Sequence, residues 1–417
     1  HYYLGAEIAA RPWVLDPRER WFALPADDAW PVDLLTPELQ DFYNPEGMVG
    51  AASLVDFNTG AAERGICALP FVCQRDGVQV WFPVNILTNL YVSNGMAAGN
   101  TVPEARAQAL AEILERHVKF RVIGEGLCLP DVPEEIIARS PSAAAGIAEL
   151  RGAGFHVLVK DASLGGRFPV INVTLLNSRD QGCFASFGAH PRLNIALERA
   201  LTELLQGRGL QAFEGLPPPS FDLDEVASPQ NLESHFIDSE GLLHWNFFAD
   251  TPDFAFVDWD ARTTTTAADK DWLVDHLHAE GHDVYIADVA TEGIYACRII
   301  VPAVSEIYPV DELEWENLNV GNALRPAILN LPHLDDAACS ELLGRLRDRE
   351  FADERRVAEL IGLAADEGSL WSDLRIGELK LLLALACGED EAIGEGCDWV
   401  RHFAQIAADR KLVYACL

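Results

Sequence analysis

Residues 91–119, YVSNGMAAGNTVPEARAQALAEILERHVK, decide the fold of the central part of this chain. The stretch opens with small residues, SNGMAAGN, which predict a loop, and continues into a helix. Thr101 and Glu104 have the S/T-x-x-E spacing of a capping box, which predicts the start of the helix at this point. The small side chains of the loop would let its backbone N–H groups lie close to a ligand.

The predicted helix carries a polar stripe along one side. Because successive residues turn by about 100°, Glu104, Gln108, Glu112 and Glu115 fall within one sector of roughly 80°, with Arg116 at its edge. The opposite side is apolar and holds Ala107, Leu110, Ile113 and Leu114. Crowded carboxylates repel one another unless a cation or an arginine lies among them. Two interpretations fit: a solvated helix face, or one wall of a binding site.

The same pattern returns in residues 184–209, FASFGAHPRLNIALERALTELLQGRG. A strand-like run of small residues leads into a second helix, whose polar cluster is Arg199, Thr202, Glu203 and Gln206. Arg199 and Glu203 could be a plain i,i+4 ion pair, worth about 0.2–0.5 kcal/mol. The alternative is a second wall of the same site. In that case Glu112, Glu115 and Glu203 would hold a hard divalent cation, and Arg116 and Arg199 would bind phosphate oxygens.

The chain resembles the YcaO superfamily, and in particular its stand-alone bacterial branch. Besides residues 93–119, the resemblance rests on SLGGRFPVINV (163–173), CFASFGAHP (183–191), ALERALTELLQGRGL (196–210) and GIYACRIIVPAVSEIYP (293–309). RGICALPF (64–71) and LRIGELKLLLALA (374–386) are similar to the stand-alone branch. Matches at many separated places in one order are far more specific than one short pattern.

The resemblance implies ATP and Mg²⁺ as cofactors, bound without a phosphate-binding loop of the common type. The sequence agrees, since it contains neither G-x-x-x-x-G-K-[ST] nor G-x-G-x-x-G. Carried over residue by residue, the family's nucleotide-binding groups fall on Asn100, Glu104, Arg116 and Arg199, and its metal ligands on Glu112, Glu115 and Glu203. No catalytic residue is assigned.

The resemblance also implies a function. Family members activate a peptide or protein amide by ATP-dependent phosphorylation, and the stand-alone branch serves as an accessory to the methylthiotransferase RimO in β-methylthiolation of a ribosomal small-subunit protein. A homodimer is the implied assembly. Two alternatives stay open: a non-catalytic adaptor with a regulatory nucleotide site, and an azoline- or thioamide-forming peptide-modifying enzyme. A proline-rich tail, which azoline-forming members tend to carry, is not seen here.

The two ends of the chain suggest a fragment. The family carries a further N-terminal segment with acids for the metal site and a lysine near the nucleotide, and nothing after His1 matches it. The other end, KLVYACL, stops inside an apparently helical run without a terminating Gly, Pro or polar tail. We therefore expect an incomplete ATP site.

Composition limits the partners and the location. The net charge is −34, from 65 acidic and 31 basic residues, which argues against nucleic acid or an anionic membrane and favours a basic protein or peptide. The nine cysteines are scattered, without a C-x-x-C pair. They are expected to be reduced thiols in a cytoplasmic protein. The longest apolar run near the C-terminus, residues 381–387, is too short to cross a bilayer.

The local patterns predict an α+β fold followed by a helical region over 332–417, in which a tetratricopeptide-like arrangement is one option. The resemblance implies that residues 1–331 form a YcaO-type ATP-binding domain. Strands are expected at 78–87, 156–160, 169–176, 284–289 and 294–301, the last two as a hairpin. Short helices are expected at 133–139 and 141–151, and C-terminal helices at 337–347, 354–365 and 374–386. His276 and His278 are expected at a helix end and not at a metal.

Overall fold

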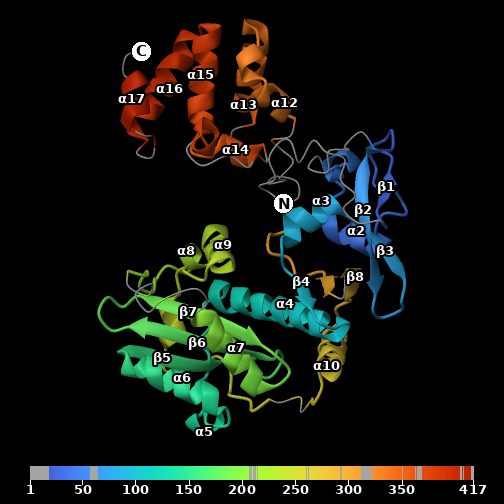
Figure 1. Ribbon diagram of the computed structural model, residues 1–417, viewed down its shortest axis with the longest axis vertical. Helices are drawn as coiled ribbons and strands as arrows, with labels where there is room; N and C mark the ends of the chain where they lie inside the picture. The colour runs from blue at the N-terminus through green and yellow to red at the C-terminus, as the bar shows by residue number, and fades with distance from the viewer. Residues whose placement is uncertain are drawn as a thin grey trace. The chain divides into compact units, whose positions relative to one another are not determined.

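The computed structural model describes residues 18–56, 64–205, 209, 213, 215–259, 261, 263–291, 294–310, 321, 323–349, 351–361, 363, 369–403, 406 and 408–414. The chain divides into two compact units (Figure 1). One comprises residues 1–69, 81–89 and 310–417, and the other residues 70–80 and 90–309. The second unit contains every residue of the predicted site.

The N-terminal part of the first unit holds short elements. Strand β1 (Arg20–Phe22) pairs antiparallel with the start of β2 (Ile66–Cys73). Helix α2 (Pro37–Tyr43) is capped by the Thr36 hydroxyl, and a 3₁₀ turn, η1, covers Ala51–Leu54. Strand β3 (Gln79–Pro83) is shorter than the predicted strand at 78–87, because α3 (Val84–Ile86) and a π turn, η4 (Leu87–Tyr91), follow Pro83.

The C-terminal part of the first unit is helical and has its own apolar core. Its elements are α12 (Arg325–Leu329), η7 (Leu331–His333), α13 (Asp336–Asp348), α14 (Val357–Leu360), η8 (Leu370–Ser372), α15 (Ile376–Cys387), α16 (Asp390–His402) and α17 (Ala408–Tyr414). The helices predicted at 337–347 and 374–386 are confirmed as α13 and α15. The helix predicted at 354–365 is confirmed only over α14. Arg356 before it is extended, because it forms a β-bridge with Arg375, and Ile361 after it no longer has helical geometry.

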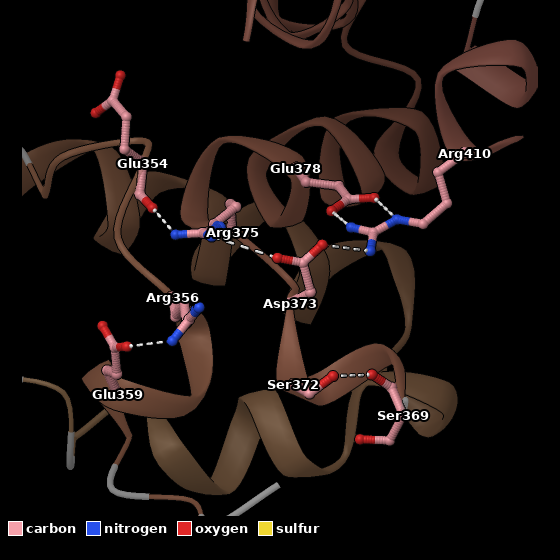
Figure 2. Close-up of polar contacts among 9 residues, drawn as sticks. All are labelled: Glu354, Arg356, Glu359, Ser369, Ser372, Asp373, Arg375, Glu378 and Arg410. Atoms are coloured by element: carbon pink, nitrogen blue, oxygen red, sulfur yellow. Dashed lines mark hydrogen bonds and ion pairs between the residues drawn. The ribbon is translucent and has the colours of Figure 1, made fainter. Parts of the chain in front are cut away.

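A buried carboxylate fastens the last described helix, α17, to α15 (Figure 2). The Glu378 side chain is 1% exposed and accepts hydrogen bonds from Arg410 Nε at 3.1 Å and from the Tyr414 hydroxyl at 2.7 Å. Asp373 lies between Arg410 and Arg375, at 3.2 and 3.3 Å. The buried Glu378 carboxylate thus has a cation and hydrogen-bond donors as partners, which burial of a charge requires.

The second unit is built on two antiparallel sheets. In one, β4 (Met96–Gly99) pairs with β9 (Ile294–Ile300), β9 with β8 (Tyr285–Thr291), and β8 with the end of β2. The other has the order β5 (Phe155–Asp161), β6 (Val170–Asn177), β7 (Cys183–Ala189). The strands predicted at 156–160, 169–176, 284–289 and 294–301 are confirmed, as is the pairing of the last two.

One long helix contacts both sheets of this unit. Helix α4 (Val102–Gly124) packs against β4 and β9 of one sheet, against β7 of the other, and against α10 (Thr266–Ala279). Helix α7 (Leu193–Leu205) lies on β6 and β7, and α6 (Pro141–Gly152) lies between β5 and α7 (Figure 1). The shorter helices are α5 (Glu134–Ile137), α8 (Leu223–Val226), α9 (Pro229–Ile237) and the 3₁₀ turn η6 (Trp245–Phe248).

Small residues bring α7 close to its sheet. A Cβ atom added at Gly188 of β7 would lie 2.3 Å from the carbonyl oxygen of Ala196 and 2.5 Å from the nitrogen of Ala200. Because no side chain fits there, strand and helix approach backbone to backbone. The run FASFGA is therefore a packing feature that fixes the position of α7 relative to α4, which packs on the same strand.

The SNGMAAGN segment is partly a strand and not the ligand-binding loop that the sequence predicted. The expected ligand-binding loop SNGMAAGN contains strand β4, whose residues Met96–Gly99 pair with Arg298–Tyr295 of β9. The N–H groups that join this ladder bind carbonyl groups of the sheet and are not available to a ligand. The predicted helix start is confirmed, since the Thr101 hydroxyl accepts a hydrogen bond from the Glu104 N–H at 3.3 Å.

Candidate nucleotide and metal site

The two predicted helix stripes meet at one cavity of about 370 Å³ within the second unit. Helix α4 contributes Gln108, Glu112, Glu115, Arg116, Lys119 and Phe120, and α7 contributes Arg199 and Glu203. Phe184 and Ser186 of β7 and residues 235–239 at the end of α9 complete the lining. Five of the seven predicted site residues thus converge: Glu112, Glu115, Arg116, Arg199 and Glu203.

Arg116 is held in place before any ligand arrives. Its Nη1 atom lies 2.8 Å from Glu112 Oε1, one turn earlier on α4, and 3.5 Å from Asn94 Oδ1. The ring of Phe236 lies over the guanidinium group, with 4.7 Å between the guanidinium carbon and the ring centroid. A charge partner and an aromatic face together fix the plane of the arginine.

Arg199 differs from Arg116. Its guanidinium group makes no ion pair or hydrogen bond with any residue that the structure describes, and Glu203 likewise has no ion pair among them. The i,i+4 pair considered between Arg199 and Glu203 is not formed. The apolar side of α7 is buried at Leu193, Ala196, Leu197, Ala200 and Leu204, so the polar side faces the cavity. Arg199 therefore offers a fork of donors to an incoming anion.

The glutamates of α4 are less acidic than usual. Burial raises the pKa of Glu115 to about 7, and the neighbouring Glu203 and Glu112 carboxylates add to this rise against the opposing charges of Arg199 and Lys119. Burial also raises the pKa of Glu112, against the charges of Arg116 and Arg199. A cation bound between such acids would lower their pKa values, because it stabilises the ionised carboxylates and offsets their mutual repulsion.

Lys119 is a site residue that the sequence interpretation missed. It is buried, and its Nζ atom donates to the His235 carbonyl oxygen at 2.5 Å and to Ser239 Oγ at 2.6 Å. Burial lowers the pKa of Lys119 to about 8, against the charge of Glu115. Its spacing of four residues from Glu115 was visible in the sequence, but its contacts with residues 235–239 were not.

The remaining predicted residues lie at the start of α4, outside the cavity lining. Glu104 Oε2 accepts a hydrogen bond from the Asn100 N–H at 3.0 Å, and both residues are exposed. The Glu104 side chain therefore closes the first turn of the helix. The roles predicted for Asn100 and Glu104 in nucleotide binding stay predictions.

The chemistry of the cavity fits magnesium and a polyphosphate. Three glutamates supply oxygen ligands, which Mg²⁺ prefers, and two arginines suit phosphate oxygens. No group of three or more His, Cys, Asp or Glu side chains within the described parts of the chain is gathered tightly enough to hold a metal alone. Mg²⁺ usually keeps waters and binds substrate phosphates beside one or two carboxylates. The ligand roles of Glu112, Glu115 and Glu203 stay predictions.

Several titratable side chains elsewhere in the second unit have structural partners. His276 lies in the last turn of α10 and stacks on Trp272, with 5.0 Å between ring centroids. Asp253 accepts a hydrogen bond from the Cys128 N–H, and Asp258 pairs with Arg139. The eight cysteines that the structure describes are free thiols. Within those same parts of the chain, no helix is long and apolar enough to cross a membrane.

These features define an α+β protein with a cavity lined by arginines and glutamates. Family comparison agrees: the family described as YcaO cyclodehydratase, ATP- and Mg²⁺-binding, matches residues 5–305, and its C-terminal domain matches residues 321–417. The chain therefore belongs to the YcaO family, as the sequence resemblance indicated, and ATP and Mg²⁺ are the family's ligands.

Two relatives are similar over nearly the whole chain. The "ribosomal protein S12 methylthiotransferase accessory factor YcaO" of Escherichia coli is 45% identical, over 100% of this chain and 72% of that protein. An uncharacterized protein of Haemophilus influenzae is 46% identical, over 95% of this chain and 68% of that protein.

Solved structures are more distant. The heterocyclase TruD has 18% identity and a TM-score of 0.44, over 69% of this chain and 43% of that one. YcaO from Methanopyrus kandleri, bound with AMPPCP and Mg²⁺, has 20% identity and a TM-score of 0.40, over 57% of this chain and 64% of that one.

Proposed function

We propose that this protein binds ATP and Mg²⁺ in the cavity between α4 and α7 and uses them to activate a peptide or protein amide by phosphorylation. The observation that supports this best is the convergence of Glu112, Glu115, Arg116, Arg199 and Glu203 on that cavity. Two separate helices contribute three cations, Arg116, Lys119 and Arg199, and three acids to one space, which suits a magnesium–polyphosphate complex.

In the proposed reaction a nucleophile adds to an amide carbonyl carbon, and the oxygen that becomes anionic attacks the γ-phosphorus of ATP. The bond between this phosphorus and the β–γ bridging oxygen breaks, ADP leaves, and phosphate later departs with the former carbonyl oxygen. Mg²⁺, when bound, neutralises phosphate charge. Arg116, fixed by Glu112 and Phe236, and Arg199, without a described partner, would hold phosphate oxygens in place, because phosphoryl transfer depends mainly on positioning and charge neutralisation.

The relative in Escherichia coli supports a more specific role. It is named as an accessory factor of the ribosomal protein S12 methylthiotransferase. We propose that the present chain likewise assists RimO in methylthiolation of a ribosomal small-subunit protein, as a homodimer in the cytoplasm. A reconstituted reaction, run with and without this protein, tests the role directly. An unchanged yield of methylthiolated product would contradict it.

The site itself is tested by calorimetric titration of ATP and Mg²⁺ into wild type, Glu115→Ala and Arg199→Ala, with Glu149→Ala as a control on the exposed face of α6. We expect binding that both site variants lose and the control keeps. ATP hydrolysis by wild type separates an enzyme from an adaptor, since an adaptor would bind the nucleotide without turning it over. If the control variant also loses ATP binding, the loss in the site variants no longer supports ATP binding in this cavity.

A further inference from the structure

One segment of the second unit concentrates negative charge. Residues 209–261 contain eleven of the 65 acidic residues of the chain and none of its 31 basic residues. Within this segment α8 carries Asp224 and Glu225 and is capped by Asp222. These three acids form no ion pair with any residue in the described ranges. Their charge is therefore presented to solvent.

The same place exposes an aromatic pair. The Phe221 side chain, directly before α8, is 82% exposed, and its ring stacks on Trp245 of η6 at 5.5 Å between centroids and 23° between planes. Trp245 also contacts Phe248 edge to face at 5.9 Å. Leu223 is 38% exposed beside them. Exposed apolar side chains that cluster and are rimmed by polar residues mark interaction sites, whereas single ones do not.

The backbone holds this pair in a fixed position. The Ser220 N–H donates to the Leu243 carbonyl oxygen at 2.8 Å, and the Trp245 N–H donates to the Ser220 carbonyl oxygen at 2.9 Å. The His244 Nε2 atom lies 3.2 Å from the Phe221 carbonyl oxygen. These contacts fix the backbone of both segments that carry the aromatic pair. Less backbone entropy is therefore lost when a ligand binds.

The aromatic pair lies within reach of the nucleotide cavity. Asn246 Nδ2 donates to the Gly126 carbonyl oxygen at 2.8 Å, which ties η6 to the end of α4, and Figure 1 shows α8 and α9 beside that end. Lys119 of the cavity precedes Gly126 by seven residues, or about 10 Å along a helix at ~1.5 Å per residue. An extended polypeptide covers that distance in about three residues.

We propose that Phe221, Trp245 and the acids of α8 dock a substrate polypeptide rich in lysine and arginine. This inference rests on the proposed function, since the docked chain would present an amide to the cavity. Aromatic faces bind guanidinium and ammonium groups, and the surrounding carboxylates supply the opposite charge. A second copy of this protein fits this surface less well, because a two-fold contact here would bring the acids of α8 against the same acids of the other copy.

The test is fluorescence anisotropy of a labelled nonapeptide of alternating Arg and Gly, titrated with wild type, Phe221→Ser and Asp224→Arg. The matched controls are Val32→Ser, which removes an 89% exposed apolar side chain elsewhere, and Glu149→Arg, which reverses an exposed charge on α6. We expect about five- to ten-fold weaker peptide binding for Phe221→Ser and Asp224→Arg, and unchanged binding for both controls. A peptide with Ser in place of Arg should not bind.

Equal weakening by the controls, or undiminished binding by Phe221→Ser, would overturn the docking surface. So would self-association of wild type that Phe221→Ser abolishes, since the surface would then join two copies. Titration of wild type with a fluorescent ATP analogue and Mg²⁺ is run in parallel. If wild type fails to bind the nucleotide but still binds the peptide in a way that depends on Phe221, the proposed function is contradicted and the docking surface is not.

Discussion

The Nη1 atom of Arg116 lies 2.8 Å from Oε1 of Glu112, one turn away on the same helix, and the two side chains share the wall of one cavity. The second arginine of the cavity, Arg199, has no ion-pair partner among the residues described. One arginine is therefore oriented in advance, and the other carries a charge that a ligand can satisfy.

Removal of the Arg199 guanidinium group should weaken binding of the ATP–Mg²⁺ complex by about ten- to a hundred-fold in Arg199→Ala, since hydrogen bonds to charged groups contribute about 1.5–3 kcal/mol. Arg199→Lys should recover only part of the loss, because an ammonium group cannot make the planar two-point contact. Calorimetric titration gives the affinities. Arg139→Ala, which removes an exposed partner of Asp258, is the control, and an affinity loss of equal size there would argue against a specific role for Arg199.

Glu115→Gln should stabilise the protein without ligand while it impairs the binding of ATP and Mg²⁺. Burial raises the pKa of Glu115 to about 7 from its ordinary value of 4.5. The folded state thus holds the proton more tightly than the unfolded state. The free energy of unfolding of wild type should fall as pH rises from about 4.5 to 7, by on the order of 1–3 kcal/mol from this group.

The glutamine variant lacks this loss, so the difference in unfolding free energy between the two proteins should be largest near pH 8 and should vanish near pH 4. Urea denaturation at both pH values measures it. A difference that does not change with pH would show that the Glu115 carboxyl is not the titrating group.

Lys119→Met should loosen the turn at residues 235–239. The substitution leaves the His235 carbonyl oxygen and Ser239 Oγ without their donor, which costs about 1–3 kcal/mol of unfolding free energy. Phe236 belongs to this turn and covers Arg116, so nucleotide affinity should fall as well. Lys270→Met, which removes a salt bridge to the exposed Asp271, is the control. If Lys119→Met binds the nucleotide with wild-type affinity, the turn at residues 235–239 does not contribute to nucleotide binding.

Glu104 tests the part of the predicted site that lies outside the cavity. Glu104→Gln keeps a side chain that can accept from the Asn100 N–H, so the start of α4 and the melting temperature should be preserved. If Glu104 also contacts the nucleotide complex through its charge, as predicted, affinity should drop several-fold. Equal affinity in wild type and Glu104→Gln, measured by the same titration, would restrict Glu104 to helix capping.

The buried Glu378 should control whether α17 stays docked. Glu378→Ala leaves Arg410 and Tyr414 without their shared acceptor (Figure 2), and loss of one partner of a buried charge pair costs about 3–5 kcal/mol. We expect faster cleavage by trypsin after Arg410 and no change in nucleotide affinity. Arg401→Ala breaks an exposed pair with Asp398 and should cost at most about 1 kcal/mol. If trypsin cleaves Glu378→Ala after Arg410 at the wild-type rate, as expected for the Arg401→Ala control, Glu378 does not hold α17 in place.

Local patterns predicted the regular elements well. The T-x-x-E spacing at Thr101 marked the start of α4, and Ser140-Pro141 marked the start of α6. The pattern failed where long-range pairing competes with local preference. Arg356 sits in a stretch with helical character, yet its backbone pairs with Arg375. The small residues of SNGMAAGN predict a loop, yet Met96–Gly99 within it pair with β9 as a strand.

The sequence alone determined which side chains form the polar stripes of α4 and α7, because the 3.6-residue period fixes which residues share a helix face. It also determined the family, from motifs spread along the chain. Only the tertiary structure decided that both stripes face one cavity, since the packing of α4 and α7 on β7 sets their relative position. It alone added Lys119, Phe236 and Ser239, whose partners lie more than a hundred residues away in sequence or come from another helix, and no local periodicity encodes such contacts.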